Sequence, residues 1–334
     1  MSSWIQRVGA LFGGHAAAPG VAAPRAARRS ASPARAVAMM SAAPVAPLAD
    51  LEPAGLTAPE TADDPQQALF GWLLGTGASL DMPLLPHEHR RLARLDAVLA
   101  DDDSHAELLP RAPAVIPQLM NSLRDERQSA HALADRVAKD PHLVAEVIRL
   151  ANGAGVRAAE PVSDLPQAVL RLGTQGLRRA ISKVVLKPIF DAPADSLSGR
   201  AAPRLWLHSE AAATECMRLA GAAGLDPFEG YLAGLMHNIG WTAALRILDR
   251  TPAVGGGAPL QFSSAFVLAL KPRREMLFAK LVRPWQLTDA LTALAAEILA
   301  SGLRASPSTL AQALREADRH ASLVMLAEGT SPTV

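Results

Sequence analysis

The residues of this sequence that could perform metal-dependent chemistry are two histidines, His208 and His237. His237 lies in the stretch LAGLMHNIGW, residues 232–241, whose apolar residues indicate a buried helix. A histidine followed directly by an acid in such a helix would be half of a metal-dependent phosphohydrolase site. Here Asn238 follows instead, and a neutral amide brings no negative charge to a cation. The stretch is therefore either an active site or the remains of one.

A hydrolytic metal centre also needs a carboxylate, whose charge holds the cation and helps to form the attacking hydroxide. The later stretch KPRREMLFAKLVRPWQLTDALTALAAEI, residues 271–298, contains no histidine. Its acids are Glu275, Asp289 and Glu297, and its first turn carries Arg273 and Arg274. Of these acids, only Asp289 is a plausible late ligand. We therefore expect no catalytic centre, no bound metal and no cofactor.

The alternative is that His208 and His237 retain some metal or ligand binding. We favour a purely structural interpretation, in which both are buried, neutral side chains between packed helices. Each ring nitrogen of a buried histidine needs a hydrogen-bond partner. Asn238, Ser209 and backbone carbonyls are the expected partners.

The elements that position these residues are predicted to be helices. Hydrophobic residues make up 49% of the chain but aromatic residues only 4%, a composition that favours helices over strands. From residue 67 onward, apolar residues recur with helical spacing and no convincing strand is found. The expected helices are residues 86–100, from about 114, 141–151 with Asp140 as N-cap, 165–172, 174–185 after a break at Gly173, 203–220, from 226, 263–270, 273–282, 286–301, and from about 306.

Composition excludes several classes of protein. The net charge of +1 gives no strong attraction to nucleic acid or to an anionic membrane. Cys216 is the only cysteine, so a disulfide framework within the chain and a cysteine-rich zinc site are both excluded, and we expect an inert core thiol. No stretch is long and apolar enough for a transmembrane helix. A cytoplasmic location is expected.

The first 66 residues are predicted to be a disordered tail rich in alanine, proline and arginine. Residues 1–49 contain no acid, and five arginines lie at positions 7, 25, 28, 29 and 35. Such a segment buries too little apolar area to offset its ordering entropy. Two alternatives stay open: an organelle transit peptide, or a short docking helix formed by Trp4, Ile5, Val8, Leu11 and Phe12.

A basic stretch between Asp164 and Asp191 is the one candidate for an anionic partner. It contains no acid and carries Arg171, Arg178, Arg179, Lys183 and Lys187. The last three of these are spaced four apart, along one face of a helix. Such a stripe can contact phosphates, although it is more often a solvated helix face.

Several segments in order give the chain a family likeness. They are LLPRAPAVIPQL, AKDPHLVAEVIRLANG, LPQAVLRLGTQGLRRAI, LWLHSEAAA, YLAGLMHNIG and VRPWQLTDAL. This run resembles the HDOD domain, the HD-related output domain of bacterial signalling proteins. The resemblance implies an all-α bundle related to HD phosphohydrolases, with His208 and His237 at the two histidine positions and Asn238 where the aspartate would stand.

The resemblance also suggests how the chain is divided. We expect a disordered tail over 1–66, a short helical preface over 67–107, an HDOD-like domain over 108–302, and a C-terminal helix and tail over 303–334, packed on the domain. No receiver, cyclase or phosphodiesterase domain is recognised, so such a partner is expected to act in trans.

The sequence therefore predicts a non-catalytic regulatory protein that binds a partner protein or a small signalling molecule. A divergent metal-dependent phosphohydrolase acting on nucleotides or cyclic dinucleotides is the first alternative. A nucleic-acid-binding regulator is the second. The oligomeric state is left open.

Overall fold

The computed structural model describes residues 65–76, 79–101, 130–153, 160–251 and 261–328. Within these ranges the chain is helical, and the only β-type pairing is one isolated bridge between Leu80 and Ser263. The prediction of an all-α fold is confirmed. The N-terminal tail, the helix expected from residue 114 and the glycine-rich stretch 255–257 lie outside the described residues. No helix in the described ranges is long and apolar enough to cross a bilayer.

The described residues form eleven α-helices and two 3₁₀ turns. In order they are α2 (Pro65–Leu74), α3 (Pro86–Ala100), α5 (Ala130–Val137), α6 (Pro141–Ala151), α7 (Leu165–Leu186), the 3₁₀ turn η2 (Lys187–Ile189), α8 (Leu197–Ala222), α9 (Pro227–His237), α10 (Ile239–Asp249), α11 (Ser264–Val282), the 3₁₀ turn η3 (Arg283–Trp285), α12 (Asp289–Ala305) and α13 (Thr309–Ala327).

Local signals set several helix boundaries as predicted. The Asp140 carboxylate accepts hydrogen bonds from the backbone N–H groups of His142 and Leu143, and so caps α6. Gly173 has φ 62° and ψ −171°, which breaks the helical path inside α7 at the predicted position. Helix α3 occupies the predicted residues 86–100.

Several helix boundaries differ from the prediction. The helix expected from 226 through the stretch 232–241 ends at His237, and a new helix, α10, begins at Ile239. The segments expected at 263–270 and 273–282 form one helix, α11, with Pro272 inside it. Pro272 is exposed, so the carbonyl that loses its helical partner there can be solvated. Helix α8 begins at Leu197, not at residue 203, because Ser196 caps it: the Ser196 hydroxyl accepts from the backbone N–H of Gly199 at 2.9 Å. The Asp249 carboxylate, 52 residues away, also accepts from the N–H groups of Leu197 and Ser198.

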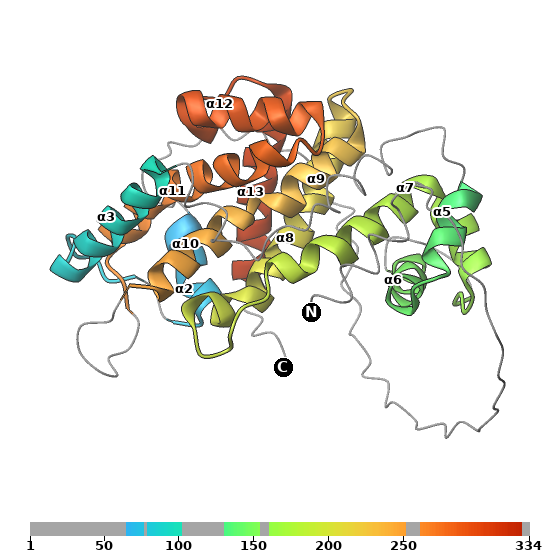
Figure 1. The fold of residues 1–334 in the computed structure, drawn as a ribbon, viewed down its shortest axis with the longest axis horizontal. Coiled ribbons are helices and arrows are strands. Elements are labelled where there is room, and N and C mark those ends of the chain that lie inside the picture. Colours follow the sequence, from blue (N-terminus) through green and yellow to red (C-terminus); the bar gives the residue numbers. More distant parts are fainter. Residues whose placement is uncertain (1–64, 77–78, 102–129, 154–159, 252–260, 329–334) are drawn as a thin grey trace, which may run out of the picture.

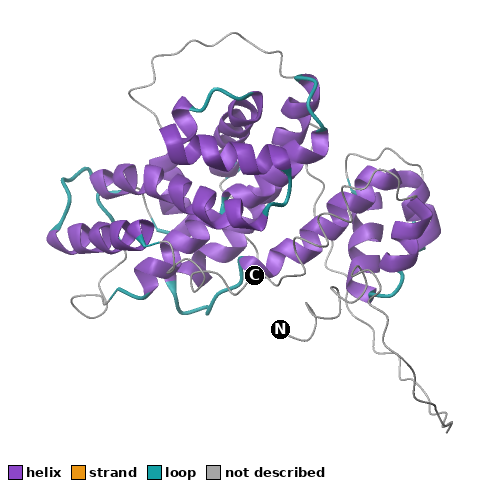
Figure 2. Ribbon diagram, turned by 45° about the horizontal axis from the view of Figure 1, so that its top comes forward, coloured by secondary structure: helices purple, strands orange, loops and turns teal. Residues whose placement is uncertain are grey.

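Most helices form one body, and α5, α6 and the first part of α7 form a smaller group beside it (Figure 1). Figure 2 shows the same separation after rotation, with α7 leading from the smaller group into the body. In the body, α8 and α9 pack on each other, α13 packs along α8, and α11 lies between α10 and α12. Apolar side chains from both groups belong to one buried cluster.

A buried carboxylate anchors the preface helix α3 to the body. Glu88 on α3 is fully buried, and it accepts from the backbone N–H of Ser263 at 2.7 Å and from the Ser263 hydroxyl at 2.6 Å. The same carboxylate accepts from the N–H of Leu85 at 2.9 Å. These bonds join the start of α3 to the start of α11, but they do not decide where one domain ends and another begins, so the predicted division of the chain stays a prediction.

Small residues let α8 and α9 approach closely enough to bring the two histidines together. A Cβ added at Gly234 on α9 would lie 2.6 Å from both the Ala212 carbonyl oxygen and the Ala213 Cα on α8. One turn earlier, a Cβ added at Gly230 would lie 2.5 Å from the Cys216 carbonyl oxygen. The backbones are therefore in contact along this interface.

We expect Gly234→Ala to lower the free energy of unfolding by about 3 kcal/mol, because the new methyl group meets backbone atoms that cannot move independently. Gly221→Ala is the matched control. Gly221 lies in the last turn of α8, and its added Cβ would meet only the ring of Pro227, at 3.2 Å. Urea denaturation of both variants measures the difference. Equal stability of the two variants would show that α8 and α9 are not in backbone contact.

Candidate functional site

His208, from the middle of α8, has both ring nitrogens occupied by protein partners. Its Nδ1 lies 2.8 Å from Nδ2 of Asn238, and its Nε2 lies 3.0 Å from the Ser322 hydroxyl. The amide nitrogen of Asn238 can only donate, so Nδ1 accepts and Nε2 carries the proton. The Ser322 hydroxyl in turn donates to the Asp318 carbonyl oxygen at 2.7 Å. This network assigns His208 as a neutral imidazole with a fixed tautomer.

His237 is the last residue of α9, and Asn238 links that helix to α10. Both residues are buried, and the Asn238 amide nitrogen also lies 3.0 Å from the Ser209 hydroxyl. Asn238 is thus a partner of His208, as the sequence suggested, whereas Ser209 bonds to Asn238 and to the Leu205 carbonyl oxygen. The Asn238 side chain therefore acts here as a hydrogen-bond donor, and its Oδ1 is buried without a hydrogen-bond partner among the described residues.

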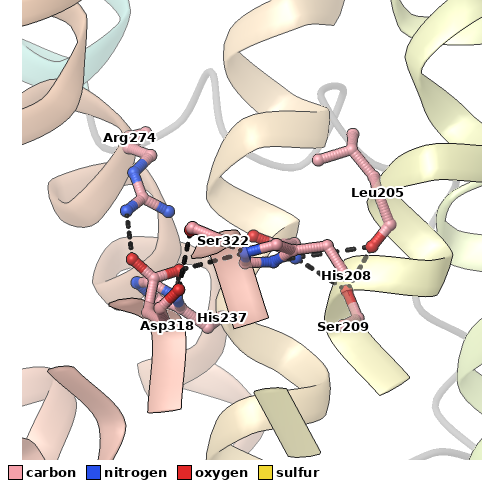
Figure 3. Close-up of polar contacts among 8 residues, drawn as sticks. Leu205, His208, Ser209, His237, Arg274, Asp318 and Ser322 are labelled. Atoms are coloured by element: carbon pink, nitrogen blue, oxygen red, sulfur yellow. Dashed lines mark hydrogen bonds and ion pairs between the residues drawn. The ribbon is translucent and has the colours of Figure 1, made fainter. Parts of the chain in front are cut away.

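The carboxylate that meets both histidines comes from the C-terminal helix. Asp318 on α13 is buried, with Oδ1 3.2 Å from Nδ1 of His237 and 4.0 Å from Nε2 of His208. Its other oxygen, Oδ2, accepts from Nη2 of Arg274 on α11 at 3.0 Å. Figure 3 shows Arg274, Asp318, Ser322 and the two histidines gathered at one point between the helices.

Asp289, the one plausible late ligand in the stretch 271–298, is not the carboxylate that meets the histidines. Asp289 is exposed at the first residue of α12, capped by Thr288, whereas Asp318 is buried. Asp318 lies beyond residues 271–298, in the C-terminal helix that the sequence predicts only to pack on the domain. The signal that could have found it is an acid, followed four residues later by Ser322, on the same face as Leu314, Ala317 and Ala321.

Arg274 is 1% exposed, and its guanidinium lies 5.1 Å from the centre of the Trp241 ring. Burial alone would raise the pKa of the Asp318 carboxyl, but the charge of Arg274 and then that of His237 hold that pKa well below its usual range. The ionised carboxylate and the guanidinium neutralise each other. No net negative charge is left for a divalent cation from this pair.

The geometry does not fit a catalytic metal centre. Among the described residues, no group of three or more histidine, cysteine, aspartate or glutamate side chains is placed to hold a metal ion. The His208 ring nitrogens are used in hydrogen bonds, Asn238 offers no charge, and Asp318 is paired with Arg274. His237 lies near Asp318 without a well-aligned hydrogen bond, and its ring packs edge-on against Phe278 at 5.5 Å.

The five basic residues of the predicted anionic-partner surface do not form a continuous exposed stripe. Arg178 is buried, with its guanidinium 5.9 Å from the centre of the Phe228 ring. Arg171 donates to the Glu160 carbonyl oxygen at 3.0 Å. Arg179 is partly buried against the sulfur of Met217.

The remaining two basic residues differ sharply from each other. Lys183 forms ion pairs with Glu146 on α6 and Glu210 on α8, and its side chain is 14% exposed. Lys187 is exposed at the end of α7. Burial of Lys183 lowers its pKa to about 8 despite the two carboxylates. The structure therefore leaves Lys187 as the member of the set that faces solvent most fully.

Cys216 lies buried in α8, and burial raises the pKa of its thiol to about 12. A thiol that stays protonated at neutral pH is a poor nucleophile. This environment fits the expected inert core thiol.

We expect Asp318→Asn to lower the free energy of unfolding by roughly 3 kcal/mol or more, because it leaves the buried Arg274 charge without a counter-ion. The matched control is Asp289→Asn, the same change at an exposed carboxylate, which should cost about 0.5 kcal/mol or less. Chemical denaturation at pH 7 compares the two. A loss at Asp289 as large as that at Asp318 would contradict the assignment of Asp318 as the buried carboxylate.

The stability of the folded chain should depend on pH through His208. Burial lowers the pKa of His208 from its ordinary 6.5 to about 4, with Asp318 partly opposing the shift and Arg274 adding to it. Between these values the unfolded chain binds a proton that the folded chain does not. Folding is therefore favoured above pH 6.5, and the stabilisation is lost as the pH falls toward 4, by a total of about 3 kcal/mol.

His208→Gln should flatten this dependence between pH 6.5 and 5, a window above the titration of the carboxylates. His89→Gln, a change at an exposed histidine, should leave the slope as in the wild type. Urea denaturation across this range provides the measurement. An unchanged slope in His208→Gln would show that another group titrates.

Comparisons with known proteins place this geometry in a family. The HDOD domain family model matches residues 109–300. An HDOD domain protein with unknown function from Geobacter sulfurreducens is 24% identical, with a TM-score of 0.50, over 70% of this chain and 78% of that one. A structure from Shewanella amazonensis SB2B, called "Putative metal-dependent phosphohydrolase", is 19% identical, with a TM-score of 0.53, over 75% of this chain and 86% of that one.

The two structures show the fold alone at this level of identity. No curated protein matches the chain. The family match covers more than half of the sequence, includes the helices that carry His208 and His237, and agrees with the all-helical architecture. The chain belongs to the HDOD domain family.

Proposed function

We propose that this protein is a non-catalytic regulatory module of bacterial signalling. Its HDOD domain binds a partner protein or a small regulator, and the bound state is passed on without hydrolysis at His208, His237 and Asn238. It acts in the cytoplasm, and the tail, preface, domain and C-terminal helix keep the boundaries expected from the sequence.

One observation carries this proposal: the Asp318 carboxylate is paired with the Arg274 guanidinium at 3.0 Å. In a hydrolytic centre, a carboxylate at such a position would hold a divalent cation and its hydroxide. Here the Asp318 carboxylate is neutralised by the Arg274 guanidinium. Asn238 supplies a hydrogen bond where a second carboxylate would supply a negative charge. The polar residues at this point support packing between α8, α9, α11 and α13.

A metal-dependent phosphohydrolase is the second candidate, because three possible ligands do converge. His208, His237 and Asp318 come from three helices, and Oδ1 of Asp318 lies 4.0 Å from Nε2 of His208 and 3.2 Å from Nδ1 of His237. The name of the Shewanella structure points the same way. The Arg274 charge opposes this reading, since a divalent cation beside it would meet a like charge in a buried site.

Metal analysis separates the two functions. We expect the wild-type protein, incubated with excess Mn²⁺ and desalted, to retain no stoichiometric metal and to hydrolyse no bis(p-nitrophenyl) phosphate above the buffer rate. His208→Ala and His237→Ala should give the same result as the wild type. The double variant Asn238→Asp/Arg274→Met, which removes the internal cation and adds a carboxylate, should retain more Mn²⁺ than the wild type does.

The controls for the double variant are its far-ultraviolet circular dichroism and the single variant Asn238→Asp, which keeps Arg274. Near-stoichiometric metal in the wild type that disappears in both histidine variants, together with turnover of the phosphodiester, would replace the regulatory proposal by the enzymatic one.

A further inference from the structure

A groove of about 400 Å³ lies on the smaller helical group, between α6 and the junction of α7 with η2. One wall is a single face of α6, from His142 to Arg149. The other wall is formed by Val184 at the end of α7, Lys187 and Pro188 in η2, and Asp191 just after that turn. On the first wall the lining residues are spaced three and four apart, which places them on one side of α6. Its volume is in the range of sites that hold small organic molecules.

The groove combines apolar and charged groups. Ala145, Val184 and Pro188 provide apolar surface from both walls. Glu146 and Arg149 supply charge from α6, and Lys187 and Asp191 supply it from the opposite wall. A ligand that fills it therefore needs an apolar part as well as a charged one.

The charge of Glu146 is already satisfied within the protein. Its oxygens accept from Nε of Arg149 at 2.8 Å and from Nη2 of Arg149 at 2.6 Å, and the Lys183 ammonium lies 3.4 Å away. Burial opposes ionisation, but these cations outweigh it and lower the pKa of the carboxyl. The Glu146 carboxylate would therefore attract a cationic ligand only weakly.

The negative charge of Asp191 is also partly balanced, because the Arg246 guanidinium lies near enough to interact with it. Arg246 also donates a hydrogen bond to the backbone carbonyl oxygen of Asp191 at 2.8 Å. Lys187 differs: its exposed ammonium makes no hydrogen bond or ion pair with any described residue. The bidentate pair with Glu146 uses Nε and Nη2 of Arg149, so Nη1 lies outside that pair. The charge in the groove that no other group of the protein neutralises is therefore positive, and it lies on Lys187.

We propose that this groove binds a small organic anion, with an apolar ring or chain against Ala145, Val184 and Pro188 and a carboxylate, phosphate or sulfonate held by Lys187 and Arg149. This rests on the proposed function, for which it supplies a ligand of stated chemistry. Charge-assisted hydrogen bonds from ammonium and guanidinium groups are the strong ones for such oxygens.

The groove is well placed to report its occupancy to the body of the protein. Glu146 forms one groove wall and also pairs with Lys183 on α7, which pairs in turn with Glu210 on α8. Helix α8 carries His208 and packs on α9 and α13. An anion that draws Arg149 away from Glu146 changes the charge balance of this three-helix link.

The test uses 8-anilino-1-naphthalenesulfonate, which joins an aromatic body to a sulfonate, as the probe. Fluorescence and calorimetric titration of the full chain should show one saturable site. Lys187→Glu should weaken the affinity about tenfold or more, the loss expected when one charge-assisted contact becomes repulsive. Lys139→Glu, the same charge change at an exposed lysine of this helical group that does not line the groove, should leave the affinity unchanged.

A second variant tests the sign of the effect. Asp191→Asn removes the negative charge of the groove and should tighten probe binding about threefold, the size of an exposed charge interaction. The proposal is overturned if the wild type shows no saturable binding, or if Lys187→Glu binds the probe as the wild type does. Neither result bears on metal content or phosphodiester turnover, so failure here is distinguishable from failure of the proposed non-catalytic function.

Discussion

The buried ion pair between Arg274 and Asp318 is the interaction on which the candidate site depends. It joins α11 to α13 at the point where α8 and α9 present His208 and His237. A buried ion pair adds little net stability, but removal of one partner leaves a charge without compensation. The pair therefore fixes the arrangement: each charge is tolerated in the core only because the other is there.

The remaining polar groups at this point follow from that pairing. Asn238 donates to His208, His208 donates to Ser322, and Ser322 donates to the backbone of the helix that carries Asp318. Each step assigns a proton without requiring a bound ion. A hydrolytic site keeps an open position for water on a metal, whereas this chain uses both ring nitrogens of His208 and the Asp318 carboxylate to connect helices.

Charge on the smaller helical group is organised in the same manner. Lys183 forms ion pairs with acids of α6 and α8 and is largely buried between them. The sequence places it in a basic helix face, but in the structure it connects three helices. Arg178 is likewise buried, with its guanidinium 5.9 Å from the centre of the Phe228 ring, so it too is not part of an exposed basic face. Lys187, beyond the end of α7, is left to face the groove.

The sequence by itself determined the features that are local. Helical periodicity, the Asp140 cap and the break at Gly173 each depend on residues a few positions apart, and the structure agrees with them. The sequence also located two of the residues that meet at the site, His208 and His237, and the loss of charge at Asn238. Only the tertiary structure decided which acid and which cation complete it. Asp318 and Arg274 lie 44 residues apart and on different helices, and Asp249 adds to the local Ser196 cap of α8 from 52 residues away. Contacts of this kind are created by the packing of helices, so neither composition nor periodicity along the chain can specify them.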